Sequence, residues 1–296
     1  LIEGIMMRGP EVTSMGVRTP EGTIDLETWP THKGNGIPWY KKAPLIRGIF
    51  NMIDTLTLGF SCLMKSADKA GMEEEEPSKF EKWVAKTFHA DLSGVVNAIA
   101  IILGVGLAFL LFILVPSSLS SLLRPRVPNN FLLTLIEGII KIGIFVLYLW
   151  LTSRMAEMKR LYGYHGAEHK TIACYEAGEE LTVENVRKYI RFHPRCGTSF
   201  LILVLIISIL VTSVVTWSSV LLRVLLKVLL LPVIVGISYE LIKLAGRYDN
   251  LFTRIISAPG LWLQRLTTRE PEDDQIEVAI AAMEQVIPED QNADNW

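Results

Sequence analysis

The stretch VVNAIAIILGVGLAFLLFILV, residues 95–115, decides the class of fold. It carries no charged side chain and is long enough to cross a bilayer as a helix, which takes about 20 apolar residues. Similar apolar runs occupy 131–151, 200–217 and roughly 221–245. Hydrophobic residues make up 50% of the chain and gather in these runs. The sequence therefore predicts a mainly α, polytopic membrane protein with about four transmembrane helices.

The apolar runs divide the chain into six predicted segments. These are an N-terminal β element at 1–43, an interfacial or re-entrant helix with a charged linker at 44–94, a transmembrane hairpin at 95–151, a helical cytoplasmic segment at 152–198, a second transmembrane hairpin at 199–246, and an interfacial anchor with an amphipathic helix at 247–296. The β element is predicted because VTSMGVRTPEGTIDLETW alternates apolar and polar residues on both sides of the turn signal PEG. We expect a short hairpin there, with Met15 and Val17 on one face and Gly16 on the other.

Two segments outside the long runs are also partly apolar. The stretch 44–70 is interrupted by Arg47, Asn51 and Asp54, so an interfacial or partly inserted helix is expected rather than a lone span. Near the C-terminus, PEDDQIEVAIAAMEQVI predicts a helix with one apolar face, which we expect to dock on a partner surface. The apolar residues of that face are Ile276, Ile280, Met283 and Ile287.

The distribution of Lys and Arg predicts the orientation in the membrane. Eleven lie in residues 1–94, two in 116–130, eight in 152–198 and five from Lys243 onward. Because basic residues favour the cytoplasmic side, both termini and the 152–198 segment are expected in the cytoplasm. A net charge of −2 argues against nucleic acid as a partner, which leaves membrane lipids as the expected surroundings. The odd number of cysteines, without CxxC spacing, predicts no disulfide framework.

The motif HGAEH, residues 165–169, carries the strongest chemical signal. A helix is predicted from about His165 to Ala177, ended by Gly178, and residues four apart on a helix share a face. His165 and His169 can then bind one transition metal, most suitably zinc, with Glu168 beside them to take a proton from a bound water. This H-x-x-E-H pattern is that of the inverted zinc metallopeptidases.

A catalytic zinc needs a third protein ligand. A second short helix is predicted in VENVRKYIRF, and the HPRC that follows it brings His193 and Cys196 back toward the membrane surface. His193 is the first choice for the third ligand and Cys196 the second. Further carboxylate candidates are Glu176, Glu179, Glu180 and Glu184.

Three uses of this site remain open from the residues alone. An open site with three ligands would be hydrolytic, with Glu168 as general base. A closed site of His165, His169, His193 and Cys196 would be structural and would fasten the cytoplasmic segment to the third span. In the third and weakest interpretation Cys196 acts as a nucleophile beside His193, although no orienting group is evident.

Charged residues inside the apolar runs require partners or water. Glu137 and Lys141 lie one helical turn apart and are expected to form an ion pair, whereas Arg223 and Lys227 are expected to extend toward the membrane surface. The alternative is a polar path into the bilayer, lined by Glu137, Lys141 and Glu240.

Four stretches resemble the YqhQ family of bacterial membrane proteins. They are EGIMMRGP at 3–10, YHGAEHKTIACYEAGEELTVENVRKYIRFHPRCGTSF at 164–200, SYELIKLAGR at 238–247 and PGLWLQRLTTREPEDDQIEVAI at 259–280. The resemblance covers nearly the whole chain. It implies a multi-pass protein of the bacterial inner membrane in a family that is uncharacterised and described as metal-dependent.

The leading functional hypothesis is zinc-dependent hydrolysis of a membrane-associated lipid or peptide. The alternative is a non-enzymatic membrane scaffold, or a conduit for a lipid or solute, in which the metal is structural. Glu168 separates the two, because a hydrolase needs this base and a structural site does not.

Overall fold

The computed structural model describes the chain except for residues 32–40, 73–91, 195, 214–219, 249 and 289–296. Most of the charged linker predicted in the second half of 44–94 lies outside these described residues. The chain forms two compact units. The first, which we call the site unit, contains Leu1–Met72, Val146–Ser208 and Leu230–Trp296, and the second, the helical unit, contains Glu73–Phe145 and Ile209–Leu229.

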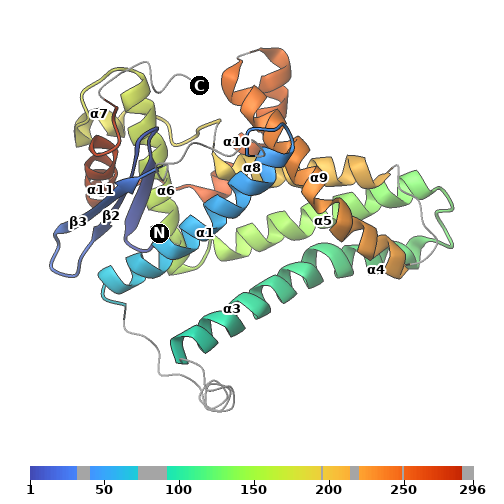
Figure 1. Cartoon of the computed structure of the whole chain (residues 1–296). Coiled ribbons are helices and arrows are strands. Elements are labelled where there is room, and N and C mark those ends of the chain that lie inside the picture. Colours follow the sequence, from blue (N-terminus) through green and yellow to red (C-terminus); the bar gives the residue numbers. More distant parts are fainter. Residues whose placement is uncertain (32–40, 73–91, 195, 214–219, 249, 289–296) are drawn as a thin grey trace. The chain divides into compact units, whose positions relative to one another are not determined.

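The chain is mainly helical, as predicted, with one small sheet near the N-terminus (Figure 1). The helices are α1 (Ile46–Lys69), α3 (Leu92–Phe109), the π-helix η2 (Leu110–Leu114), α4 (Val115–Leu123), α5 (Asn130–Thr152), α6 (Ala156–Glu176), α7 (Val183–Arg187), α8 (Gly197–Ser213), α9 (Val220–Arg247), α10 (Leu251–Thr267) and α11 (Asp273–Glu284).

The sheet has three antiparallel strands in the order β1 (Gly4–Arg8), β2 (Val12–Arg18) and β3 (Ile24–Pro30). The predicted hairpin is β2–β3, and Gly22 in its turn has a φ of 84°, which favours glycine. Strand β1 was not predicted as part of the sheet. The alternation along β2 buries Met15 and Val17 together with Cys62 of α1, whereas Gly16 faces α11.

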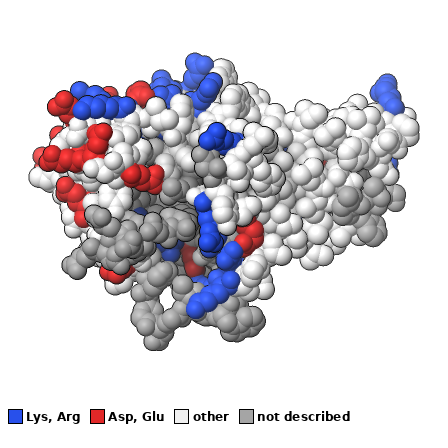
Figure 2. Space-filling view, turned by 90° about the horizontal axis from the view of Figure 1, so that it is seen from above, with Lys and Arg blue, Asp and Glu red and all other residues white. Residues whose placement is uncertain are grey.

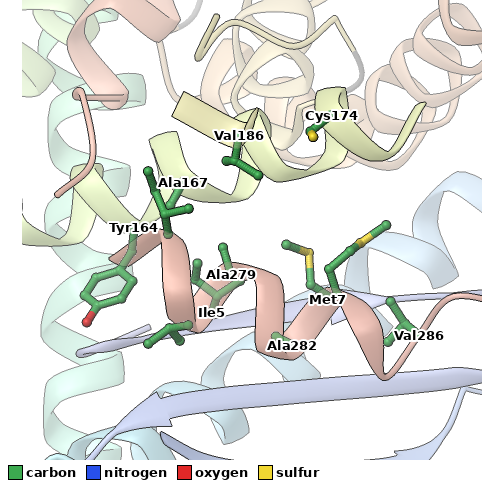
Figure 3. Close-up of a cluster of buried hydrophobic side chains, with 12 residues drawn as sticks. Ile5, Met7, Tyr164, Ala167, Cys174, Val186, Ala279, Ala282 and Val286 are labelled. Atoms are coloured by element: carbon green, nitrogen blue, oxygen red, sulfur yellow. The ribbon is translucent and has the colours of Figure 1, made fainter. Parts of the chain in front are cut away.

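The core of the site unit lies between the sheet, α6 and α11. Figure 3 shows side chains from β1, α6, α7 and α11 pointing toward one another. The expectation that α11 docks on a partner surface is wrong, because its buried residues pack against β1, β2 and α6 of the same chain. Ile276 and Met283 are buried as the pattern required, whereas Ile287 lies beyond the helix and is 39% exposed.

Helix α6 is longer than its motif predicted. It begins at Ala156 rather than near His165. Tyr162 and Tyr164, which precede the motif, belong to the same helix and are buried. Its predicted end is confirmed, since Gly178 follows with a φ of 72°. The second predicted helix is the short α7, which begins after Thr182, whose side chain accepts a hydrogen bond from the Asn185 amide.

Helix α1 packs against α9 within the site unit. Gly48 allows the close approach, since a Cβ there would press on Tyr239. The polar groups that interrupt α1 find partners on α9: Arg47 forms an ion pair with Glu240, and Asn51 donates a hydrogen bond of 2.7 Å to the Tyr239 hydroxyl. Two of the three interruptions in the apolar pattern therefore mark helix–helix contacts, whereas Asp54 forms an ion pair with Lys41.

Among the described residues, three helices are long and apolar enough to cross a membrane: Gly94–Leu123, Asn130–Thr152 and Val224–Arg247. Helix α8 is apolar but has only 17 residues. The first of these helices does not end near Val115 as predicted, because η2 and α4 continue it to Leu123. Pro116 is tolerated there because it stands in the first turn of α4. The surface of the helical unit is almost uncharged on the face in Figure 2.

The charges buried in the helical unit are paired differently from the prediction. Glu137 forms an ion pair with Lys227 rather than with Lys141. Its carboxylate also accepts hydrogen bonds from Ser117 at 2.9 Å and Ser120 at 3.3 Å. Lys227 is therefore drawn into the helix contact instead of extending outward, since an unpaired carboxylate in that position would be costly. The side chain of Arg223 lies outside the described residues.

Candidate metal centre

Helix α6 presents His165 and His169 one turn apart, with their ring centroids 4.4 Å from each other. Gly166 lies between them and contacts the chain that follows α10, where a Cβ would overlap the backbone carbonyl of Arg269. This close approach holds residues 267–269 against α6 and brings the main-chain carbonyl of Thr267 to His165.

Both imidazole rings are oriented by backbone carbonyls. His165 Nδ1 lies 2.8 Å from the carbonyl oxygen of Thr267, and His169 Nδ1 lies 2.7 Å from that of Arg191. Because a carbonyl only accepts, each Nδ1 carries the proton and each Nε2 is turned to the other side. A backbone carbonyl on the second ring nitrogen is a common feature of histidines that bind metals.

Cys196 completes the cluster from the residue just before α8. Its Sγ lies 3.1 Å from His165 Nε2 and accepts a hydrogen bond of 3.4 Å from the Thr198 amide. Burial alone would raise the pKa of this thiol, but the hydrogen bonds with His165 and His169 outweigh burial and lower the pKa to about 5. Burial likewise opposes the charged form of His165, and Cys196 raises the pKa of that imidazole to about 9. Each group thus favours the charged form of the other, the imidazolium of His165 and the thiolate of Cys196.

These three side chains fit a divalent transition metal. Their ligand atoms, two imidazole nitrogens and one sulfur, all lie within 4.8 Å of one another. Bonds to zinc of about 2.0–2.3 Å separate tetrahedral ligands by about 3.3–3.6 Å, so a small inward movement would complete the geometry. Imidazole and thiolate ligands suit zinc, and binding there would release a proton from His165 or Cys196.

His193, the first choice from sequence, lies beside this cluster rather than in it. Its backbone N–H donates to the side chain of Gln264 at 2.8 Å, and its carbonyl accepts from the same amide at 2.7 Å. The ring centroid is 5.8 Å from that of His169, and Nε2 is 3.6 Å from a carboxylate oxygen of Glu176. The structure thus places Cys196 in the third position and pairs His193 with an acid.

A cavity of about 1330 Å³ opens beside the cluster. Its lining includes His165, Glu168, His169, His193 and Cys196. The carboxylate of Glu168 is partly exposed and accepts no hydrogen bond from the described residues. It is therefore available to a water or a ligand in the cavity. Of the other acids considered from sequence, Glu176 and Glu179 line this cavity, whereas Glu180 and Glu184 do not belong to its described lining.

Comparison with known proteins places the chain in a family. Residues 43–289 match the family model described as "Protein of unknown function (DUF1385)". The chain belongs to this family. It is also 34% identical over 293 residues to the "Uncharacterized protein YqhQ" of Bacillus subtilis (strain 168), a match that covers 97% of this chain and 90% of that relative. The resemblance to the YqhQ family is therefore confirmed, and no solved structure matches the chain.

Several groups that build this site in the DUF1385 chain were not predicted from its sequence. Gln264 fixes His193 from α10 and also donates to Ser199 at 3.2 Å. Thr267 and Arg191 contribute only backbone carbonyls. A carbonyl has no sequence signature, and the sequence does not distinguish Gln264 from a solvated residue. In the structure Gln264 is fully buried, and a buried amide requires hydrogen-bond partners.

Proposed function

We propose that this protein binds a divalent transition metal, most suitably zinc, through His165, His169 and Cys196, and that it hydrolyses a membrane-associated substrate in the adjoining cavity. The observation that carries the proposal is the convergence of three ligand atoms within 4.8 Å. Two features support it further: both histidines are held by backbone carbonyls, and the partly exposed Glu168 lines the same cavity.

In this mechanism Glu168 is the general base. Its carboxylate would accept a proton from a water molecule as the water oxygen attacks a carbonyl or phosphoryl centre, and the proton would then pass to the leaving group. A bound metal would supply a Lewis acid for that centre. His193 and Glu176, 3.6 Å apart, would stand at the side of the cavity and orient polar groups of the substrate.

We further propose that the protein is a multi-pass protein of the bacterial inner membrane, with four crossings and both termini in the cytoplasm. The Lys and Arg distribution along the sequence supports this orientation. Three helices have sufficient length, and α8 is proposed as the third crossing in sequence. Its 17 residues span about 26 Å at about 1.5 Å per residue, close to the hydrocarbon thickness of about 30 Å.

The non-enzymatic alternatives receive less support. A closed structural site would need His193 as fourth ligand, yet its imidazole is directed to Glu176. A conduit would need charged groups that face a path, whereas Glu137 is paired with Lys227 and Glu240 with Arg47. These pairings favour a packing role for the charges within the apolar helices.

The test of the hydrolytic function is the substitution Glu168→Gln. It keeps size and hydrogen bonding but removes the base, so metal content and melting temperature should stay as in the wild type while function falls by roughly two to four orders of magnitude. Function is measured by complementation of the defect of a deletion strain. The matched control is Glu179→Gln, an acid of the same cavity that lies beyond the end of α6 and outside the motif. Full complementation by Glu168→Gln would exclude this mechanism.

A further inference from the structure

Helix α10 has the reverse of the usual amphipathic pattern. Its buried residues, apart from Leu263, are small or polar and recur at helical spacing on one face: Thr253, Ser257, Gly260, Gln264 and Thr267. Its large apolar residues are instead each more than half exposed: Leu251, Phe252, Ile255 and Trp262. A surface helix of a soluble protein buries its apolar side and exposes its polar side. The outer side of α10 therefore favours contact with an apolar partner.

The inner face of α10 packs closely against α8. Gly260 allows this approach, since a Cβ there would overlap the side chain of Ser199. The Gln264 amide donates to the Ser199 hydroxyl at 3.2 Å and to the His193 carbonyl at 2.7 Å. Small residues and side-chain hydrogen bonds between helices are typical of helix packing within membranes. The inner face thus has the character of a membrane-helix contact, which agrees with an apolar environment on the outer side.

The position of α10 in the chain identifies a lipid surface as its partner. The preceding helix segment, Val224–Arg247, is long and apolar enough to cross a membrane. Helix α10 begins at Leu251, and the connection from Arg247 spans at most about 14 Å when fully extended. Where α9 leaves the bilayer, α10 therefore begins close to the membrane surface. Tyr248 and Trp262, both about half exposed, are of the residue types enriched at that interface.

Basic residues on α10 indicate how the helix is oriented. Arg254 and Arg265 are exposed and lie about three helical turns apart, on one flank of the apolar face. Long basic side chains on such a flank can extend toward the headgroups while their stems remain against apolar surface. A helix with one apolar face and basic residues beside it lies along the membrane surface rather than crossing the bilayer.

We propose that α10 lies in the membrane–water interface, with Leu251, Ile255 and Trp262 among the acyl chains of the bilayer. This placement rests on the proposed location of the protein in a membrane, and it is independent of the metal and of the hydrolytic mechanism. A bilayer accounts for the reversed amphipathic pattern, for the start of α10 beside the end of α9, and for the basic flank of the helix.

The inner side of α10 contacts the candidate metal centre. Gln264 binds the backbone of His193, and the carbonyl of Thr267 accepts a hydrogen bond from His165. An α-helix with its side chains is about 10–12 Å in diameter. The two histidines therefore lie about one helix diameter from the acyl chains, next to the headgroup layer. A membrane-associated substrate can then reach the metal cavity from the lipid.

The test measures what surrounds α10 in the full chain, reconstituted into bilayers of phosphatidylcholine and phosphatidylglycerol. A spin-labelled p-acetylphenylalanine is placed at Leu251, Ile255 or Glu284 in turn, which leaves all cysteines intact. Electron paramagnetic resonance compares the accessibility of each label to oxygen, which enters lipid, and to a water-soluble nickel chelate. Glu284, exposed on α11, is the matched control. The oxygen-to-nickel ratio at Leu251 and Ile255 should be at least about tenfold higher than at Glu284, because a polar reagent is excluded from an apolar environment.

Further labels separate this placement from the proposed function. A label at Ile139, exposed on α5, should also show a high ratio. If Ile139 does so but Leu251 and Ile255 match the control, the placement of α10 is wrong and the membrane location stands; a low ratio at Ile139 as well would contradict both. Low accessibility of Leu251 and Ile255 to both reagents would show a protein contact, such as a second copy of the chain, and would overturn the lipid assignment. His165→Ala/His169→Ala should lose metal without changing any ratio.

Discussion

Each of the two units contains a polar cluster, and the clusters differ in how their polar atoms are paired. In the helical unit, Glu137 receives Lys227, Ser117 and Ser120 on its two carboxylate oxygens. In the site unit, the ligand atoms of His165, His169 and Cys196 are directed at one another. The first cluster neutralises itself and stabilises helix packing. The second brings three side chains of the types that ligate transition metals close to one another.

The largest expected effect distinguishes the clusters by metal binding. Wild-type protein supplied with zinc should carry about one ion per chain, and His165→Ala/His169→Ala should carry none, because a lone thiolate cannot hold the metal. The measurement is elemental analysis of protein purified without chelators. As a control, Glu137→Gln/Lys227→Met should retain the full metal content. If wild-type protein supplied with zinc stayed metal-free, the cluster of His165, His169 and Cys196 would not be a metal site.

The next effect concerns the helical unit. Lys227→Met alone leaves Glu137 buried without its cation, and we expect a loss of about 3–5 kcal/mol in the free energy of unfolding. The double variant Glu137→Gln/Lys227→Met should recover most of that loss, because the buried carboxylate is then removed together with its cation. Unfolding is followed by tryptophan fluorescence in mild detergent. If the double variant were as unstable as the single one, the pair would not be the source of the stability.

A smaller effect is expected where α6 meets residues 267–269. Gly166→Ala would place a methyl group against the carbonyl of Arg269, at a cost of about 1–3 kcal/mol in stability. The displacement would also move the Thr267 carbonyl away from His165, so metal affinity should fall about 10- to 100-fold. Gly104→Ala, with open space around the added carbon, is the matched control and should change neither quantity. An unchanged metal affinity in Gly166→Ala would remove the orienting role of Thr267.

The smallest effect is a pH dependence outside both clusters. Hydrogen bonds from Arg160 lower the pKa of Glu3 below its usual value, against burial, and Tyr164 adds to this. The resulting stability is present above the unfolded-state pKa of the carboxyl group and is lost as the pH falls through the lower folded-state pKa. Because Glu3 is partly exposed, the contribution should be less than about 1 kcal/mol.

Glu3→Gln tests this dependence. The variant should be slightly less stable than the wild type at neutral pH, and the difference should shrink as the pH falls through the acid range. The measurement is the melting temperature of both proteins along a pH series. Glu11→Gln, at an acid for which the described residues provide no side-chain ion pair, serves as control. A difference between wild type and Glu3→Gln that grows toward acid pH would contradict the sign.

Local patterns in the sequence were sufficient to predict the class of fold, one hairpin and part of the candidate site. The apolar runs predicted the membrane class, the alternation around PEG predicted the β2–β3 hairpin, and the four-residue spacing predicted that His165 and His169 share a face. Each of these depends on the period of a helix or strand, which a short stretch of sequence expresses by itself. The position of Glu168 beside the two histidines follows from the same local geometry.

The choice of partners was decided only by the tertiary structure. Lys227 rather than Lys141 pairs with Glu137, α11 covers the sheet of its own chain, and Cys196 rather than His193 joins the histidines. In the last case, hydrogen bonds from Gln264 of α10 hold the His193 backbone. Such selections depend on contacts between elements far apart in the chain, where several residues of suitable chemistry compete and packing selects one of them. Spacing in the sequence specifies which residues can take part, whereas the fold determines which of them meet.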